Sequence, residues 1–292
     1  MIPLILAILT STIIGVIFKY FDRFGIDNFQ AVTFNYFTCL LTGSLLDQSL
    51  PFSRDVLDAP WFTYDLLLGL LFITGFNFAA IAFQKFGIAL TSVMQRMSLI
   101  ITVGVTIIFF RESGTLLKLI GILLAISAIF LVNRKSGQII PDDKPPRIFF
   151  FFPLFVLLIS AVIEIILFYV EYTGTLQGQH MPFTTHGFGI AALFGIVILV
   201  PGYMTGRFRF KWRHLIAGLI LGVPNYFSIY LITLMLREGM EASVGFPILN
   251  VSVLLLSALL AWKMFDEHLS KSNWTGIILS MVAIILIALS SQ

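Results

Sequence analysis

The chain is dominated by long apolar stretches that are separated by short polar segments. Ten of these stretches carry few charges and come close to the ~20 residues that a helix needs to cross a bilayer. They cover residues 3–21, 29–46, 61–83, 88–110, 115–133, 149–172, 182–205, 212–236, 241–263 and 271–290. The segments between them are too short to form a domain outside the membrane. The pattern therefore predicts an all-α integral membrane protein with ten transmembrane helices, a multi-pass protein of the cell membrane.

The composition agrees with this pattern and excludes several other classes of protein. Hydrophobic residues make up 58% of the chain and charged residues only 11%, whereas an ordinary soluble domain has about 25% charged residues. The net charge of +3 is spread over the loops, so we expect no nucleic-acid partner. The single cysteine, Cys39, permits no internal disulfide and no Cys/His metal cluster. We expect no metal and no cofactor, and as partners a lipid bilayer and a small-molecule substrate.

The sequence contains an internal repeat. Residues 110–131 match residues 265–286, and the matches include Glu112 with Glu267 and Gly121 with Gly276. Apolar helices match one another easily, so the shared Glu and Gly at equal spacing are the better sign of duplication. Five predicted helices lie on each side of a linker at 138–148, and an odd number reverses the direction of the second half. The sequence predicts inverted five-helix repeats over residues 1–137 and 149–292.

Two copies of one helix boundary carry a resemblance to a known family. Each copy has an aromatic helix end, a Glu after a short turn and a helix with an early glycine, at 109–112 with Gly121 and at 264–267 with Gly276. By these residues and its five-plus-five pattern, the chain resembles the ten-helix EamA-like members of the drug/metabolite transporter superfamily. The resemblance implies a secondary active transporter of a small metabolite, amino-acid-like or another organic solute, coupled to protons or to exchange. It also implies a substrate cavity built from the first, third, fourth, sixth, eighth and ninth helices.

Polar residues recur at helical spacing in five of the six helices that the resemblance assigns to the cavity. A polar side chain facing lipid costs free energy, so such a stripe marks the face that looks into the bundle or into a wet cavity. Stripes of this kind can also hold neighbouring helices together. The substrate-binding candidates are Arg96, Gln95, Asn77, Asn225 and Asn250.

Arg96 and Glu164 are the two ionisable residues deepest in their predicted helices. A charge at the centre of a span is penalised by at least ~2.5–3.5 kcal/mol, so each needs a reason. Arg96 either snorkels to the helix end or faces the cavity and receives an anionic group of the cargo. Glu164 either pairs with Arg96 or takes up and releases the coupling proton. In the small four-helix relatives of the superfamily a first-helix Glu carries the proton, and Glu164 lies on the repeat equivalent of that helix.

Glu112 and Glu267 each precede a predicted helix. A carboxylate in that position stabilises the positive end of the helix that follows. We expect both to have a structural role.

The sequence carries no motif for ATP hydrolysis or for an intramembrane enzyme. Walker A, HExxH and GxSxG patterns are all absent. We therefore expect a transporter and not an enzyme. The alternatives that stay open are a lipid flippase, an accessory membrane subunit and, less favoured, an intramembrane enzyme.

Overall fold

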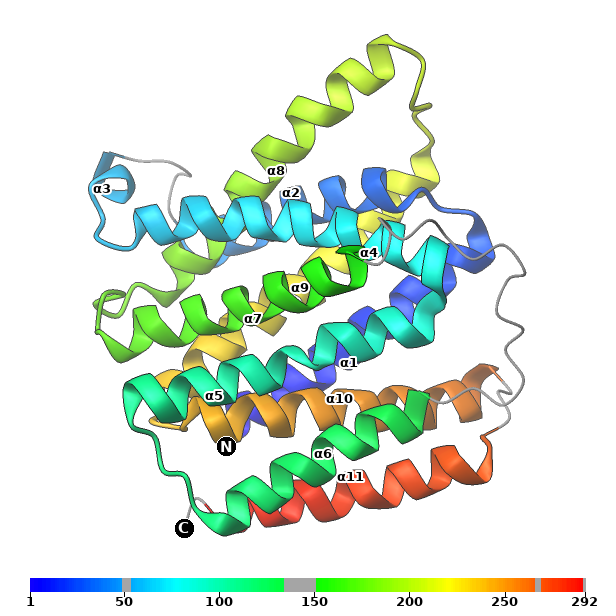
Figure 1. The fold of residues 1–292 in the computed structure, drawn as a ribbon. Coiled ribbons are helices and arrows are strands. Elements are labelled where there is room, and N and C mark those ends of the chain that lie inside the picture. The colour runs from blue at the N-terminus through cyan, green and yellow to red at the C-terminus, as the bar shows by residue number, and fades with distance from the viewer. Residues whose placement is uncertain (49–53, 134–150, 266–268, 291–292) are drawn as a thin grey trace. The chain divides into compact units, whose positions relative to one another are not determined.

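The computed structural model describes residues 1–48, 54–133, 151–265 and 269–290 (Figure 1). Its helices are α1 (Ile2–Phe24), α2 (Asn28–Asp47), α3 (Arg54–Leu57), α4 (Phe62–Arg96), α5 (Ser98–Phe110), α6 (Leu116–Asn133), α7 (Phe151–Tyr172), α8 (His180–Met204), α9 (Trp212–Arg237), α10 (Ala242–Phe265) and α11 (Lys271–Leu289). Local side chains fix some of the helix starts. The Asp27 side chain accepts the N–H of Gln30 at the start of α2, and Ser270 and Asn273 form a capping box at the start of α11.

The all-α membrane fold that the sequence predicts is confirmed. In the described residues, eight stretches are long and apolar enough to cross a membrane: α1, Phe62–Ala79, Val93–Phe110 and most or all of α7, α8, α9, α10 and α11. The 20-residue α2 and the shorter apolar α6 are the other two helices of similar length. Large apolar side chains such as Leu45, Ile108 and Val197 stay exposed on the helix surfaces. Lipid is the solvent that such surfaces require.

The predicted boundary between the third and fourth spans, at residues 83–88, is wrong. Helix α4 continues from Phe62 to Arg96, and α5 begins at Ser98. The break lies at Met97, where the Ile100 N–H donates to the Met97 carbonyl across only three residues (3.1 Å). The apolar runs were divided there by length, but the connection between them holds only one glycine, Gly87, and one glycine weakens a helix by only ~1 kcal/mol. Arg96 therefore stands at a helix junction inside the apolar stretch Val93–Phe110.

The chain forms two compact units. Unit 1 comprises Met1–Asn77 and Ile166–Glu238, and unit 2 comprises Phe78–Ile165 and Gly239–Gln292. Each unit contains segments from both halves of the sequence, so this division differs in kind from the repeats expected at 1–137 and 149–292. The linker expected at 138–148 lies outside the described residues, and the repeat boundaries stay a prediction.

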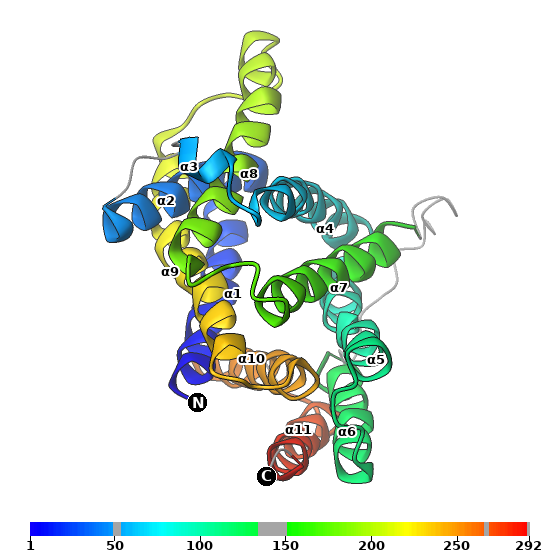
Figure 2. The same cartoon turned by 90° about the vertical axis from the view of Figure 1, so that its left-hand side faces the viewer.

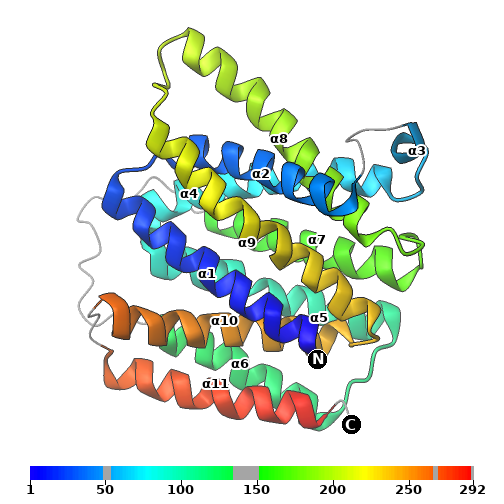
Figure 3. The ribbon, with the colours of Figure 1, turned by 180° about the vertical axis from the view of Figure 1, so that it is seen from behind.

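In unit 1, α2 approaches α9 closely because glycines of α9 face it. A Cβ atom added to Gly222 would lie 2.3 Å from Thr38 Cβ and 2.8 Å from the Asn35 carbonyl oxygen. Figure 3 shows that α1 also crosses and contacts helix α9. Small residues at helix contacts give backbones the close approach on which packing within a membrane depends.

Replacing Gly222 with alanine is expected to destabilise the protein by roughly 1–3 kcal/mol, because the new methyl group overpacks this contact. The matched control is Gly104→Ala, since a Cβ on Gly104 meets nothing within 4 Å. That control gains helix propensity without a clash, so its melting temperature should stay unchanged or rise. Thermal unfolding of both variants in detergent makes the comparison, and equal melting temperatures would contradict the packing argument.

In unit 2, α6 and α11 lie side by side, as Figure 2 shows almost along their axes. A Cβ on Gly121 would lie 2.7 Å from Ile287 Cγ1, and a Cβ on Gly276 would lie 2.7 Å from the Val132 nitrogen. The two glycines are matched in the sequence repeat, and Val132 and Ile287 follow them at the same spacing. Each glycine therefore meets the repeat equivalent of the residue that the other glycine meets. Reciprocal contacts of this kind are typical of two-fold-related repeats and support the duplication.

Candidate functional site

The carboxylate of Glu164, on α7, is the centre of a polar cluster within unit 2. Its Oε2 accepts a hydrogen bond from Thr102 Oγ1 (2.6 Å) and its Oε1 accepts from Ser98 Oγ (3.2 Å). A third bond to Oε1 comes from Asn250 Nδ2 on α10 (3.1 Å). The carboxylate thus has three donors from two helices, which is the environment that a buried carboxylate requires.

Arg96 joins this cluster through Asn250. Its Nη1 donates to the Asn250 carbonyl oxygen (2.9 Å) and lies 3.5 Å from the Asn250 Oδ1. Asn250 therefore contacts the guanidinium with its oxygens and the Glu164 carboxylate with its amide nitrogen. The pairing of Arg96 with Glu164, one of the two alternatives for Glu164, takes an indirect form: Asn250 lies between the two charges and accepts from Arg96 chiefly through its main-chain carbonyl.

The break in the chain at Met97 is what brings these groups together. Arg96 is the last residue of α4 and Ser98 is the first residue of α5. Ser98 and Thr102 are four residues apart, so they share one face of α5, and both side chains are fully buried. Arg96, Glu164 and Asn250 are only half-buried. The cluster consequently has a closed side made by the hydroxyls and a side that remains accessible.

Two predicted site residues belong to unit 1 and not to this cluster. Asn225 Nδ2 donates to Asn35 Oδ1 (3.2 Å), and Asn77 Nδ2 donates to the carbonyl of Ile73 in its own helix (2.7 Å). The bond to Asn35 holds two helices together, which is the alternative that the sequence left open for such residues.

Gln95, the fifth candidate, lies beside Arg96 in the chain, and its side chain is exposed. The polar stripes of the third and fourth predicted helices also include Gln84 and Ser92, whose side chains lie outside the described part of the structure. The sequence interpretation did not name Ser98 as a site residue. Its spacing of four from Thr102 was the signal that could have found it.

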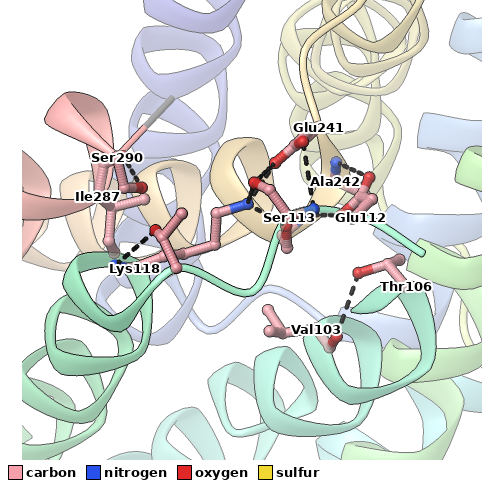
Figure 4. A network of polar contacts seen from close by, with 11 residues as sticks. Val103, Thr106, Glu112, Ser113, Lys118, Glu241, Ala242, Ile287 and Ser290 are labelled. Carbon is pink, nitrogen blue, oxygen red and sulfur yellow. Dashed lines mark hydrogen bonds and ion pairs between the residues drawn. The ribbon is translucent and has the colours of Figure 1, made fainter. Parts of the chain in front are cut away.

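A second polar network lies at the start of α10 in unit 2 (Figure 4). The fully buried Lys118 donates to Ser113 Oγ (2.7 Å), to Ser243 Oγ (3.0 Å) and to the Glu241 carboxylate. Burial alone raises the pKa of the Glu241 carboxyl, but hydrogen bonds from Lys118 and Ser113 and the Lys118 charge hold that pKa below its ordinary value. The pair therefore stabilises the start of α10 at neutral pH, and this contribution is lost as the pH falls through the lowered pKa.

Glu112 has the structural role expected of it, but at a different helix. Its two carboxylate oxygens accept the N–H groups of Ala242 (2.7 Å) and Ser243 (2.8 Å), the first residues of α10. The sequence expectation assigned it to the helix that follows it in the chain, because spacing alone does not show which helix end folds against a loop. Glu267 lies outside the described residues.

The described residues offer no ready metal site. No three or more His, Cys, Asp and Glu side chains among them lie close enough together to hold a metal ion. The expectation that the protein needs no metal or cofactor stays a prediction.

The fold and the cluster define a multi-pass integral membrane protein with a pair of opposite charges among its helices. Residues 1–134, a little under half of the chain, match the EamA-like transporter family, and this match bears out the resemblance to the drug/metabolite transporter superfamily. The chain is also 27% identical over 297 residues to an uncharacterized protein of Haemophilus influenzae, with 96% of this chain and 95% of that protein covered. A protein of known crystal structure has a similar fold, with a TM-score of 0.75 and 12% identity over 99% of this chain and 96% of its own.

Proposed function

We propose that this chain is a secondary transporter of a small metabolite that carries a carboxylate or phosphate group, such as an amino-acid-like solute, and that it is not an enzyme. The observation that carries the proposal is the bridged pair of Arg96 and Glu164 at Asn250. A charge inside the membrane costs free energy, so two of them at one place indicate a function. Transport by alternating access would give both of them one, and the match to a transporter family supports this proposal.

Arg96 is the proposed receptor for the anionic group. Among the described residues, its hydrogen bonds come from Nη1, and both go to Asn250. The edge formed by Nε and Nη2 therefore keeps its donors for a ligand. A planar guanidinium edge binds a carboxylate or phosphate through two parallel hydrogen bonds, which a lysine ammonium does not reproduce.

Glu164 is the proposed carrier of the coupling proton. Three donors stabilise the ionised carboxylate in the conformation described here. A proton added to the carboxylate removes its charge and weakens the bond from Asn250. Asn250 also accepts hydrogen bonds from Arg96, through its main-chain carbonyl and its side-chain oxygen. Protonation of Glu164 therefore reaches the proposed substrate receptor through this one residue. This geometry links proton binding at Glu164 to substrate binding at Arg96.

The test is a ligand screen followed by a transport assay on the purified wild-type protein. A ligand at 100 times its Kd stabilises by ~2.7 kcal/mol, so thermal shift against a metabolite library identifies the binders. We expect the binders to share a carboxylate or phosphate, and to accelerate uptake of their labelled form into liposomes preloaded with the unlabelled form. Binders that are all neutral or cationic would contradict the role of Arg96. Binding without accelerated exchange, or movement of labelled lipid alone, would favour the accessory subunit or the flippase.

A further inference from the structure

Asp65, in the first turn of α4, is a completely buried carboxyl group within unit 1. Its side chain has no exposed area, and neither carboxyl oxygen forms a hydrogen bond with any described residue. The polar cluster described above belongs to unit 2 and makes no use of it. Ionisable residues inside a membrane protein are rare and expensive, so one without partners requires a function.

The surroundings of Asp65 are apolar and closely packed. A Cβ added to Gly187 on α8 would lie 3.2 Å from Asp65 Oδ1 and 3.9 Å from the Phe72 ring. Phe72 stacks on Phe188 with 5.1 Å between ring centroids. One turn before Asp65, the Trp61 indole N–H donates to Gln179 Oε1 (2.8 Å), which ties the start of α4 to the start of α8. Gly187 thus gives the carboxyl its space, in a region where Phe72 and Phe188 also pack.

A structural role as a helix cap does not explain this residue. A carboxylate near a helix N-terminus is favourable when it accepts backbone N–H groups or faces water near the positive helix end. The N–H groups of Tyr64 and Asp65 instead donate to the Trp61 carbonyl. Asp65 turns its oxygens away from these groups and toward Gly187 on α8.

The charged groups on the neighbouring helices are otherwise engaged or lie elsewhere. On α8, His186 Nδ1 is 2.6 Å from the Pro182 carbonyl oxygen, and His180 Nε2 is 2.7 Å from a carboxylate oxygen of Glu171 on α7. Asp47 ends α2 and has the same sign of charge as an ionised Asp65. No described cation is paired with Asp65.

We infer that Asp65 is a second proton-binding residue of the transport cycle: it holds a proton while α4 is packed against α8 at Gly187 and exchanges that proton with water when the two helices separate. An ionised carboxylate in this site would lack both a partner and water, a state that costs several kcal/mol. Uptake of one proton from the aqueous phase removes the charge. The inference rests on the proposed secondary transport and adds a proton to the one assigned to Glu164.

The two acids have opposite environments, which fits two different tasks. Glu164 has three hydrogen-bond donors and a nearby guanidinium, and this arrangement stabilises a carboxylate. Asp65 has neither, and its site stabilises the neutral acid. Acids whose environments differ in this way hold their protons with different affinities.

Infrared spectroscopy of the full-length protein at neutral pH tests the protonation directly. We expect the carbonyl stretch of a buried, protonated carboxylic acid in the wild type, in Glu164→Gln and in the control Asp58→Asn, which changes an exposed aspartate. We expect its loss in Asp65→Asn, where a neutral amide of the same shape replaces the acid. Should Asp65→Asn fail to fold, isotopic labelling of the aspartates in the wild type should shift the band. A band that survives Asp65→Asn, or that the label leaves unmoved, would overturn the inference.

The number of protons that move with each substrate, measured from the reversal of transport in proteoliposomes, tests the role in the cycle. We expect it to fall by one in Asp65→Asn and to stay unchanged in Asp58→Asn. Loss of the infrared band without this fall would overturn the role of Asp65 in coupling. The infrared result does not depend on transport. A protein that shows the band but transports nothing would therefore count against the proposed function and not against the protonation of Asp65.

Discussion

Glu164→Gln is expected to reduce strongly the accumulation of substrate driven by a pH gradient, while exchange of labelled for unlabelled substrate persists. The replacement removes the group proposed to bind the proton at nearly constant shape. The cycle then moves one proton fewer with each substrate molecule, so the same pH gradient sustains a much smaller accumulation. Uptake into proteoliposomes with and without an imposed pH gradient measures the loss.

The variant should keep its fold, because the cluster can accept a carboxamide. In the wild type, Thr102 Oγ1 donates to the carboxylate and also lies 3.2 Å from the Ser98 carbonyl oxygen. With a glutamine at 164, that hydroxyl can accept from the new amide and donate to the carbonyl instead. The single oxygen of the amide can keep the bonds from Ser98 and Asn250. The cluster therefore loses a charge but none of its contacts has to remain unsatisfied.

Glu171→Gln is the matched control on the same helix, since Glu171 contacts His180 and not the cluster. Substrate accumulation by Glu171→Gln should remain close to that of the wild type. If Glu164→Gln accumulates as much substrate as the wild type, Glu164 has a structural role or another ion drives transport. If both variants lose accumulation together, the effect belongs to α7 as a whole and not to the carboxylate of Glu164.

The sequence was sufficient to predict the class of fold, because every helix that crosses lipid requires a long apolar stretch. Long apolar stretches such as those of α7 and α9 have to be helices, since only helices satisfy every backbone group within the segment. The helix junction at Met97 could not be predicted in this way, because apolar residues continue through it. Its position depends on how Arg96 and Ser98 meet side chains from α7 and α10.

The site could be predicted only in part for a related reason. The stripes show which face of a helix is polar but not which helix that face meets. Asn250 and Asn225 looked equivalent in the sequence, yet Asn250 binds Arg96 and Asn225 binds Asn35. Asp65 was passed over because it stands near the start of an apolar stretch, where a charge usually faces water. Its burial depends on Gly187, more than a hundred residues away in the chain.

Arg96→Lys is expected to weaken binding of an anionic or zwitterionic substrate by roughly 1–3 kcal/mol, the scale of a lost hydrogen bond to a charged group. The charge remains, but the edge formed by Nε and Nη2 is lost, and a compact ammonium does not supply two parallel donors. Arg96→Ala should weaken binding further. Thermal-shift titration gives both affinities. Arg111→Lys, a change at an exposed arginine, is the control and should bind as the wild type does.

A purely structural role for Arg96 predicts a different result, which follows from its hydrogen bonds to Asn250. In that case Arg96→Ala would remove the hydrogen bonds to Asn250 and leave Glu164 without a nearby positive charge, and the melting temperature would fall. Adding Glu164→Gln would restore it, because the double variant no longer holds an uncompensated carboxylate. Restored stability together with unchanged substrate affinity in Arg96→Ala would refute the substrate-binding role. Weakened affinity in Arg96→Lys at unchanged melting temperature would support it, because the bridge tolerates an ammonium where a bidentate anion site does not.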